Sequence, residues 1–283
     1  MNAGIRLIRS RDNAQVKQLL QLATSSRARR GTGMTILDGA HLVQAYGQSG
    51  GTAEVLAVSA SAYADADLHA LFDQAPARTR LLLADDLITR ISQVVTSSGI
   101  LAVVRTPKPP RLPESIESCV MIEGIQDPGN LGSILRCAAA TGIGHVFLSP
   151  GSVFAWAPKV VRAGQGAHFF LAIHENVDFD DLRQRMRAKI VATEPRAQLS
   201  VFEADLSGPV AWLFGNEGAG LSGHAMALAA ARVHIPMPGQ AESLNVAAAV
   251  AICLFEQVRQ NIGRNPGQTA GASGAGWPLS ASP

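Results

Sequence analysis

Residues 127–136 hold the first polar side chains whose types and spacing suggest chemistry. Asn130 stands where a helix N-cap is expected, because asparagine is a favoured capping residue. Arg136 follows more than one turn into a helix that is otherwise apolar. An arginine there is costly unless it meets an anion or an ionic partner. The segment therefore predicts a cation directed at an anionic group. The alternative is a structural cap followed by a surface arginine.

A second segment, residues 214–220, contains three glycines and one carboxylate. Gly215, Gly218 and Gly220 allow the backbone to turn tightly and to approach a ligand closely. The segment lacks the lysine of a phosphate-binding loop and the glycine order of a dinucleotide site. Glu217 places a carboxylate in this turn. The segment is either a ligand-binding turn or a plain connection from a strand to a helix.

A third segment, residues 235–246, combines two prolines with a glycine and is predicted to form an irregular loop. The backbone N–H and C=O groups of such a loop need partners in the protein or in a ligand. Ser243 is predicted to cap the helix that follows. Asn245 is a polar residue at the start of that apolar helix. A purely structural role is the alternative for both side chains.

Each segment follows a predicted strand at its carboxyl end, the edge where ligands bind in an open α/β sheet. These strands are nearly continuous apolar runs, which favours a parallel sheet covered on both faces. They are predicted over residues 119–125, 210–214 and 232–235, with further strands over 145–149, 168–173 and 190–193. Helices are predicted over residues 131–141, 157–163, 180–188 and 243–259.

The N-terminal half also alternates strands and helices, which indicates a smaller α/β domain. Helices are predicted over residues 11–30, 39–46 and 65–72, and strands over 34–37, 53–58, 80–83 and 101–104. The prolines between Thr106 and Pro113 cannot continue a helix or a central strand. The predicted organisation is a domain over 1–105, a proline-rich linker over 106–113, a second α/β domain over 114–262 and a disordered tail over 263–283.

Composition limits the class of protein and of partner. Hydrophobic residues make up 47% and charged residues 16%, which predicts a folded core. No apolar run reaches the ~20 residues of a membrane-spanning helix. Three widely spaced cysteines and an N-terminus without an apolar signal region fit a cytoplasmic protein. The first 30 residues carry seven basic side chains and one acidic, so a polyanion such as nucleic acid is a predicted partner, with a solvated helix face as the alternative.

Together, in this order, the three segments resemble the motifs of the SpoU/TrmH-type branch of the SPOUT superfamily, which are RNA ribose 2′-O-methyltransferases that use S-adenosylmethionine. Residues 130–136 look like the first motif, and Gly215, Glu217 and Gly220 match the Gly-x-Glu-x-x-Gly motif. Residues 235–246 match the Ile-Pro-Met…Ser-Leu-Asn-Val motif almost without departure. Residues 159–167 also resemble a family segment, with Gly164 where serine is commoner. The resemblance covers residues 120–260.

Residues 36–45 and 98–104 resemble, more loosely, the family's RNA substrate-binding domain, a small α/β fold similar to some RNA-binding ribosomal proteins. Asp38 stands where glutamate is commoner. Members with such a domain often act on ribosomal RNA, so ribosomal RNA is favoured over tRNA as the partner, and no membrane is expected. The family further implies a trefoil knot in the C-terminal part of the parallel sheet. It also implies a homodimer through the C-terminal domain, whose last helix is apolar almost all round.

The resemblance also implies the roles of individual residues. S-adenosylmethionine would lie against the second and third segments. The implied cofactor-binding residues are Leu213, Gly215, Asn216, Gly218, Ile235, Met237 and Leu244. The implied catalytic group is Asn130, Arg136, Glu217, Ser243 and Asn245. No metal is expected, because the methyl donor is already activated.

The chemistry of methyl transfer limits two of these roles. The ribose hydroxyl must be held in line and its developing negative charge stabilised. Arginine is a poor base, so Arg136 is expected to stabilise the alkoxide, or to orient it through the neighbouring phosphate. Glu217 is the carboxylate of the group and is expected to accept a proton, directly or through water. A tRNA methyltransferase and a non-catalytic RNA-binding or assembly protein are the alternatives, and a nucleotide-dependent oxidoreductase is disfavoured because its glycine fingerprint is missing.

Overall fold

The computed structural model describes residues 5–92, 94, 97–108 and 111–262 and divides them into two compact units. The N-terminal unit contains the described residues up to 108 together with residues 156–169, and the C-terminal unit contains the others. The division after Lys108 lies inside the predicted proline-rich linker. The predicted tail over 263–283 lies outside the described residues. Of the helices in the described ranges, none has the length and apolar character needed to cross a bilayer.

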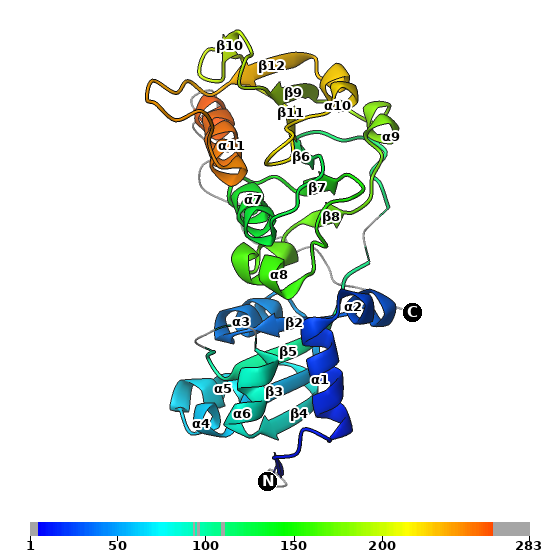
Figure 1. The fold of residues 1–283 in the computed structure, drawn as a ribbon, viewed down its shortest axis with the longest axis vertical. Coiled ribbons are helices and arrows are strands. Elements are labelled where there is room, and N and C mark those ends of the chain that lie inside the picture. The colour runs from blue at the N-terminus through cyan, green and yellow to red at the C-terminus, as the bar shows by residue number, and fades with distance from the viewer. Residues whose placement is uncertain (1–4, 93, 95–96, 109–110, 263–283) are drawn as a thin grey trace. The chain divides into compact units, whose positions relative to one another are not determined.

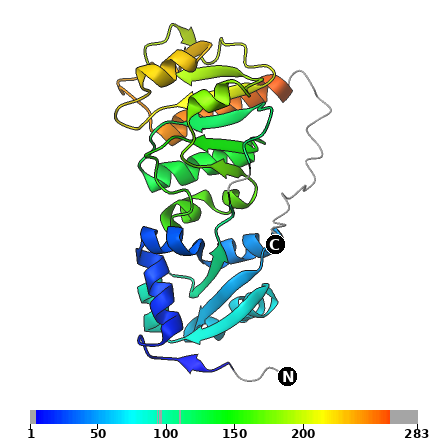
Figure 2. The same ribbon diagram turned by 90° about the vertical axis from the view of Figure 1, so that its right-hand side faces the viewer.

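The N-terminal unit is built on a five-stranded sheet in the order β1-β4-β3-β5-β2 (Figure 1). Strand β5 runs antiparallel to its two neighbours, whereas β1, β4 and β3 are parallel. Helices α1 and α6 cover one face of the sheet (Figure 2). Leu19 and Ile88 are buried there with Ala57 and Leu101. The elements are β1 Leu7–Ile8, α1 Ala14–Thr24, α2 Ser26–Thr32, β2 Met34–Asp38, α3 Ala40–Gln48, β3 Ala53–Ser59, α4 Ala60–Tyr63, α5 Ala66–Gln74, β4 Ala77–Leu83, α6 Asp85–Ile91 and β5 Ile100–Arg105.

The predicted single helix over residues 11–30 is wrong, because two helices stand there. Ser25 takes an extended conformation, ends α1 and caps α2 by accepting a hydrogen bond from the Ala28 N–H. Arg29 is buried, and its Nη1 donates to the carbonyls of Leu22 and Ala23 at the end of α1. One arginine of the basic segment therefore satisfies helix carbonyls rather than facing a partner.

Residues 156–169 pack within the N-terminal unit, although they follow β7 in the sequence of the other half. They contain α8 (Pro158–Gly164) and a 3₁₀ turn, η1 (Ala167–Phe169). The Thr35 hydroxyl donates to the Trp156 carbonyl over 2.6 Å, and the rings of Tyr46 and Phe169 lie 5.3 Å apart. Gly166 has φ +88°, and a Cβ there would lie 3.2 Å from that of Ala45. The predicted domain over 114–262 thus contains one segment that the contacts of the structure group with the N-terminal unit.

The C-terminal unit is built on a seven-stranded parallel sheet in the order β10-β12-β9-β11-β6-β7-β8. The strands are β6 Cys119–Ile122, β7 His145–Leu148, β8 Ala172–His174, β9 Lys189–Thr193, β10 Leu199–Ser200, β11 Val210–Phe214 and β12 Ala231–His234. The helices are α7 Pro128–Ala140, α9 Phe179–Arg183, α10 Gly223–Leu228 and α11 Val246–Ile262. An α/β fold with a parallel sheet was predicted and is confirmed.

Helices cover both faces of this sheet, as its apolar strands predicted (Figure 1). Alternate residues such as Cys119 and Met121 are buried with Phe179 of α9 and Ala225 of α10. Helices α7 and α11 pack against each other. Because side chains alternate along a strand, the intervening residues, including the fully buried Trp212, face the opposite side of the sheet.

Three predicted elements differ from the structure for local reasons. The helix expected over 180–188 ends at Arg183, because Ile116 exchanges main-chain hydrogen bonds of 2.8 Å with Arg185 and Arg187 and draws them into an extended bridge. The strand expected over 168–173 is instead η1 followed by the short β8. The last helix begins at Val246 rather than at residue 243.

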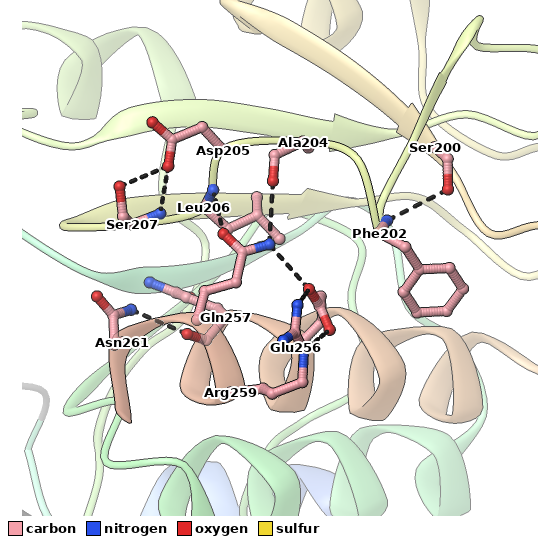
Figure 3. Close-up of polar contacts among 11 residues, drawn as sticks. Ser200, Phe202, Ala204, Asp205, Leu206, Ser207, Glu256, Gln257, Arg259 and Asn261 are labelled. Atoms are coloured by element: carbon pink, nitrogen blue, oxygen red, sulfur yellow. Dashed lines mark hydrogen bonds and ion pairs between the residues drawn. The ribbon is translucent and has the colours of Figure 1, made fainter. Parts of the chain in front are cut away.

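Amide side chains of the second half of α11 hold the chain segment that leads into β11 (Figure 3). Gln260 accepts from the Leu206 N–H over 2.9 Å and donates to the Ala204 carbonyl over 3.0 Å. Asn261 accepts from the Gly208 N–H over 3.1 Å. Deeper in the core, Gln257 accepts from the indole N–H of Trp212 over 2.8 Å and donates to the Gly208 carbonyl. These contacts fix β11 against α11.

We expect Gln257→Leu to lower the free energy of unfolding by about 1–3 kcal/mol, because the buried Trp212 N–H loses its acceptor. Chemical denaturation followed by tryptophan fluorescence measures the change. The double variant Trp212→Phe with Gln257→Leu removes both partners, and its loss should be smaller than the sum of the two single losses. Strict additivity would mean that this hydrogen bond contributes nothing to stability.

Candidate functional site

The three polar segments of the sequence lie at one edge of the C-terminal sheet. Ile122, Leu148 and Phe214 are the last residues of β6, β7 and β11 and are aligned across these parallel strands. The loops over residues 123–127, 149–155 and 215–222 therefore leave the sheet side by side. Strand β12 runs in the same direction through β9, so the loop over 235–245 also starts from this edge. The predicted placement of the segments at the carboxyl ends of the strands is confirmed.

Glu217 links the loop after β11 to the loop after β6. Its Oε1 accepts hydrogen bonds from the Asp127 N–H over 3.0 Å and from Asn130 Nδ2 over 3.1 Å. Its Oε2 accepts from the Gln126 N–H and from Asn216 Nδ2, each over 3.3 Å. Partial burial alone would raise the pKa of Glu217. The backbone N–H of Glu217 itself and the donors on Asn130, Asp127 and Gln126 outweigh burial and hold the pKa below its ordinary value of 4.5.

This geometry argues against the proton-accepting role expected for Glu217. A carboxylate whose pKa is lowered binds a proton weakly, and both of its oxygens already accept hydrogen bonds. A general base works best with a pKa near the working pH. The structure therefore favours Glu217 as a clamp that positions residues 126–130.

The polar contacts continue from Glu217 to the last helix. Asn130 donates to Glu217 through Nδ2, and its Oδ1 accepts from Asn245 Nδ2 over 2.8 Å. Asn245 Oδ1 in turn accepts from the Ala247 N–H over 2.9 Å and from the Ala248 N–H over 3.4 Å. An unbroken row of hydrogen bonds thus connects the loops of all three motifs. Each amide has a fixed orientation, because Glu217 can only accept and the helix N–H groups can only donate.

Two capping residues differ from those predicted. Asp127, not Asn130, is the N-cap of α7, and its carboxylate accepts from the Asn130 N–H over 2.8 Å. Asn245, not Ser243, caps α11, and Ser243 is exposed in the loop before it. The Asn130 side chain is therefore free to join the other motifs. The structure brings Asn130, Glu217 and Asn245 together, whereas no hydrogen bond within the described chain ties Ser243 to them.

The loop after β11 is closed on itself. Asn216 and Gly220 exchange two main-chain hydrogen bonds of 3.0 Å, and Gly220 has φ +68°. A Cβ on Gly215 would lie 2.2 Å from the Gly220 carbonyl carbon and 2.4 Å from the Leu221 nitrogen. Asn216 also donates to the Gly124 carbonyl over 2.7 Å, which ties this loop to the end of β6. Gly215 and Gly220 are thus required by the fold of the loop.

We expect Gly215→Ala to disrupt this loop, because the new methyl group meets backbone atoms that cannot move without opening the Asn216–Gly220 pair. The affinity for S-adenosylmethionine should fall by about tenfold or more, while the cooperative unfolding transition remains. Isothermal titration calorimetry measures the affinity. Gly223→Ala is the matched control, since no atom lies within 4 Å of a Cβ there. Equal effects of the two variants would contradict the steric argument.

The loop over residues 235–245 leaves its backbone open. The main-chain N–H groups of Met237 and of residues 239–244 donate to no acceptor within the described part of the chain. Ile235 and Met237 are half-buried, and Leu244 is 40% exposed. Open backbone groups beside apolar side chains suit a flat ligand that carries its own donors and acceptors.

Arg136 lies on α7, six positions beyond Asn130, and is exposed. It forms neither a hydrogen bond nor an ion pair with any residue that the structure describes. The structure therefore does not join Arg136 to the row that links Glu217, Asn130 and Asn245. Its guanidinium is available to an anionic ligand.

Three residues of this edge escaped the sequence analysis. Gln126 and Asp127 offer the N–H groups that Glu217 accepts. Glu123 accepts from both the N–H and the hydroxyl of Ser222, each over 2.7 Å, and so holds the start of α10. The Asp127-Pro128 pair was a readable signal, because proline is favoured at the first position of a helix directly after its cap. No group of three potential metal ligands occurs among the described histidine, cysteine, aspartate and glutamate residues.

Known proteins resemble this chain over nearly its whole length. Residues 117–255 match the SpoU rRNA Methylase family. A Synechocystis protein named "Uncharacterized tRNA/rRNA methyltransferase slr1673" is 31% identical over 92% of this chain and 96% of its own length. The chain belongs to the SpoU methylase family. This SpoU protein is therefore an S-adenosylmethionine-dependent RNA ribose 2′-O-methyltransferase.

Two further relatives bear on the SpoU protein's fold and activity. The 23S rRNA (guanosine(2553)-2′-O)-methyltransferase RlmP of Bacillus subtilis is 29% identical, over 88% of this chain and 97% of its own. The solved structure of the SpoU methyltransferase AviRb from Streptomyces viridochromogenes, in complex with AdoMet, has a TM-score of 0.79 and 27% identity, and covers 88% of this chain and 98% of AviRb. The likeness thus includes the N-terminal unit as well as the methyltransferase motifs.

Proposed function

We propose that this SpoU protein methylates a ribose 2′-hydroxyl in ribosomal RNA. The observation that carries the proposal is the extent of the likeness to RlmP, which acts on 23S rRNA and is covered over 97% of its length. The similarity therefore includes the N-terminal unit, for which the sequence resemblance implies substrate binding. A tRNA 2′-O-methyltransferase remains the alternative within the same chemistry.

The open loops fit S-adenosylmethionine. The unpaired backbone groups of residues 236–244 and the half-exposed Leu244 offer hydrogen bonds and an apolar surface, which adenine and ribose require. S-adenosylmethionine supplies a methyl group already activated on a sulfonium. We assign its binding to the loops after β11 and β12, through the following residues: Leu213, Gly215, Asn216, Gly218, Ile235, Met237 and Leu244.

Arg136 stabilises the charge that develops on the ribose oxygen. Its guanidinium is exposed and unpaired among the described residues, and it remains a cation at any physiological pH. A fixed cation beside an oxygen that becomes negative lowers the barrier without itself taking the proton. The positioning residues are Glu217, Asn130 and Asn245, since their hydrogen bonds hold the three loops in fixed positions relative to one another. Ser243, which is exposed in the same loop as Leu244, is available to the RNA or the cofactor.

The order of the sheet supports a trefoil knot in the C-terminal unit. Strand β11 lies between β6 and β9, both of which precede it in the chain, and β12 then lies on the far side of β9. The chain must therefore return between strands that are already placed. We assign the knot to the segment that runs through β11 and the loops after β11 and β12.

We propose that a second copy of the chain packs against α11. The helix is apolar almost all round, and its Phe255 is 50% exposed and its Ile262 48% exposed. Burial of such side chains against a partner removes apolar surface from water. We expect the protein to be a dimer at micromolar concentration and Phe255→Glu to shift it toward the monomer. Sedimentation equilibrium measures both, and a monomeric wild-type protein would contradict the proposal.

The direct test of the function is to map 2′-O-methyl groups in ribosomal RNA and tRNA from cells with and without the gene. Loss of one ribosomal site, restored by the wild-type gene but not by Arg136→Ala, is the expected result. Loss of a tRNA site would keep the chemistry and overturn the substrate. If no site is lost, a non-catalytic assembly role gains support.

A further inference from the structure

A second sheet edge, in the N-terminal unit, also carries cavities. Strands β2 and β3 end there at Asp38 and Ser59, while the antiparallel β5 begins there at Ile100. Two cavities open at this edge, one of about 340 Å³ and one of about 250 Å³. Ser98 lines both of them, so the two cavities adjoin.

The larger cavity contains a guanidinium with unused donors. Arg162 of α8 and Asp38 of β2 both line it. Arg162 Nη1 lies 3.7 Å from Asp38 Oδ2, which is close enough for ionic attraction but beyond a good hydrogen bond. That Nη1 is buried and has no hydrogen-bond partner among the described residues. Arginine carries five N–H donors in a planar fork, so this side chain still has donors to satisfy.

A carboxylate stands directly beside those donors. The Asp38 side chain is 6% exposed, and its Oδ2 accepts from the Ser92 hydroxyl over 2.8 Å. No hydrogen bond to its second oxygen is found within the described chain. His41 and Gln165 complete the polar part of the lining. The cavity thus presents hydrogen-bond donors and acceptors next to each other.

This arrangement favours a nucleobase over a phosphate. Every nucleobase has a donor beside an acceptor on its Watson–Crick edge, which matches an arginine beside a carboxylate. A phosphate offers only acceptors and would meet the negative charge of Asp38. RNA-binding proteins commonly take unpaired bases out of the stack and read their edges in pockets of this kind. A cavity of about 340 Å³ has room for a planar base.

We propose that the cavity walled by Arg162 and Asp38 binds one unstacked nucleobase of the RNA substrate. The inference rests on the proposed function, since it names a recognition site for the RNA that the enzyme methylates. The smaller cavity, lined by the hydroxyls of Ser59, Ser61 and Thr89, receives the ribose of the neighbouring nucleotide. Arg162 belongs to the segment over 156–169. Packing of that segment in the N-terminal unit therefore has a function, because it places Arg162 in the cavity.

The first experiment separates a base site from a phosphate site without using RNA. Amide signals of Ala40, His41 and Ser98 are followed by NMR in the full-length protein during titration with each of the four ribonucleosides and with ribose 5-phosphate. At least one nucleoside should shift these signals, and ribose 5-phosphate should not. Equal shifts by ribose 5-phosphate would overturn the proposal in favour of a phosphate site. Absence of shifts with all four nucleosides at millimolar concentration would also overturn it.

Two variants test whether the charge and the planar pair of donors of the Arg162 guanidinium are needed for binding. Arg162→Gln removes the charge, whereas Arg162→Lys keeps the charge but loses the planar pair of donors. Both should weaken nucleoside binding by about tenfold or more. Arg105→Lys is the matched control, because Arg105 lies on the same sheet, is exposed and pairs with Glu54 outside the cavity. Retained binding in Arg162→Lys would contradict the proposal.

A purely structural role for the Arg162–Asp38 pair predicts different effects of these variants on nucleoside binding and on stability. Asp38→Asn keeps the shape of the cavity and an acceptor while changing its hydrogen-bonding pattern, so it should change which nucleoside binds best. If the pair only holds α8 in place, the variants lower the melting temperature and leave nucleoside preference unchanged. That result would overturn the base site.

The kinetic readout separates this inference from the proposed function. With ribosomal RNA as substrate, Arg162→Gln should raise KM by about tenfold or more, and S-adenosylmethionine affinity should stay at the wild-type value. If the wild-type protein methylates ribosomal RNA but no nucleoside binds, the base site alone is wrong. If nucleosides bind but ribosomal RNA is not methylated, the proposed substrate is wrong and the cavity stands.

Discussion

Replacing Arg136 with alanine is expected to lower the rate of methyl transfer by about 10²-fold or more. Arg136 is the exposed cation of the α7 motif, and no described side chain neutralises it. Loss of one preorganised electrostatic group typically has an effect of this size on kcat. Single-turnover methylation of ribosomal RNA with radiolabelled S-adenosylmethionine measures the rate.

The cofactor should bind the Arg136→Ala variant as tightly as it binds the wild type, because the proposed cofactor loops do not include α7. Arg136→Lys keeps the charge and should recover part of the rate. Arg187→Ala, a change of an exposed arginine outside the motifs, is the control. Full activity in Arg136→Ala would remove the residue from the mechanism.

The sequence predicted the location of the site better than the hydrogen bonds that connect its residues. Glycines and prolines directly after apolar strands indicated which loops meet at one edge, because carboxyl ends of parallel strands always share an edge. The hydrogen bonds between Asn130, Glu217 and Asn245 join residues 87 and 115 positions apart, which no local pattern reports. Residue type predicted Asn130 and Ser243 as caps, but Asp127 and Asn245 are equally suitable by type and are the residues that cap the two helices.

Long-range packing explains most of the remaining differences in the fold. The helix over 180–188 was predicted from its local composition, but pairing of Arg185 and Arg187 with Ile116 overrides that preference. Residues 156–169 resemble a family segment, yet only tertiary contacts such as Thr35 with Trp156 place them in the N-terminal unit. Arg29 is likewise buried because it donates to the Leu22 carbonyl at the end of α1. The sequence predicted one continuous helix there, so it did not predict this contact.

The role of Glu217 is the point at which structure most changes the mechanism. The sequence offered one carboxylate among the motif residues, and a proton acceptor was the natural assignment. The structure surrounds that carboxylate with four N–H donors from Gln126, Asp127, Asn130 and Asn216. A proton on Glu217 would oppose these donors, so the same contacts that lower its pKa make it a positioning group.

We therefore expect Glu217→Ala to lower kcat/KM by about 10- to 100-fold, because the N–H groups of Gln126 and Asp127 lose their acceptor and the loop before α7 shifts. Glu217→Gln should have a kcat/KM between those of the wild type and Glu217→Ala. Its amide oxygen still accepts from one pair of donors, while its NH₂ group faces the other pair of donors and repels it. A general base would instead make the two variants equally inactive. Steady-state kinetics with both substrates measures the difference, and a rise in KM for S-adenosylmethionine should accompany the loss in kcat.

The dependence of the rate on pH gives an independent check. Because the folded pKa of Glu217 lies below its ordinary 4.5, the stabilisation from its hydrogen bonds is complete above that value and is lost only as pH falls through the folded pKa. The wild-type kcat should therefore show no acidic limb from Glu217 between about pH 5.5 and 7. An acidic limb in that range that is missing from the residual activity of Glu217→Gln would instead restore the carboxylate as the proton acceptor, because only a group that must lose its proton to act produces such a limb.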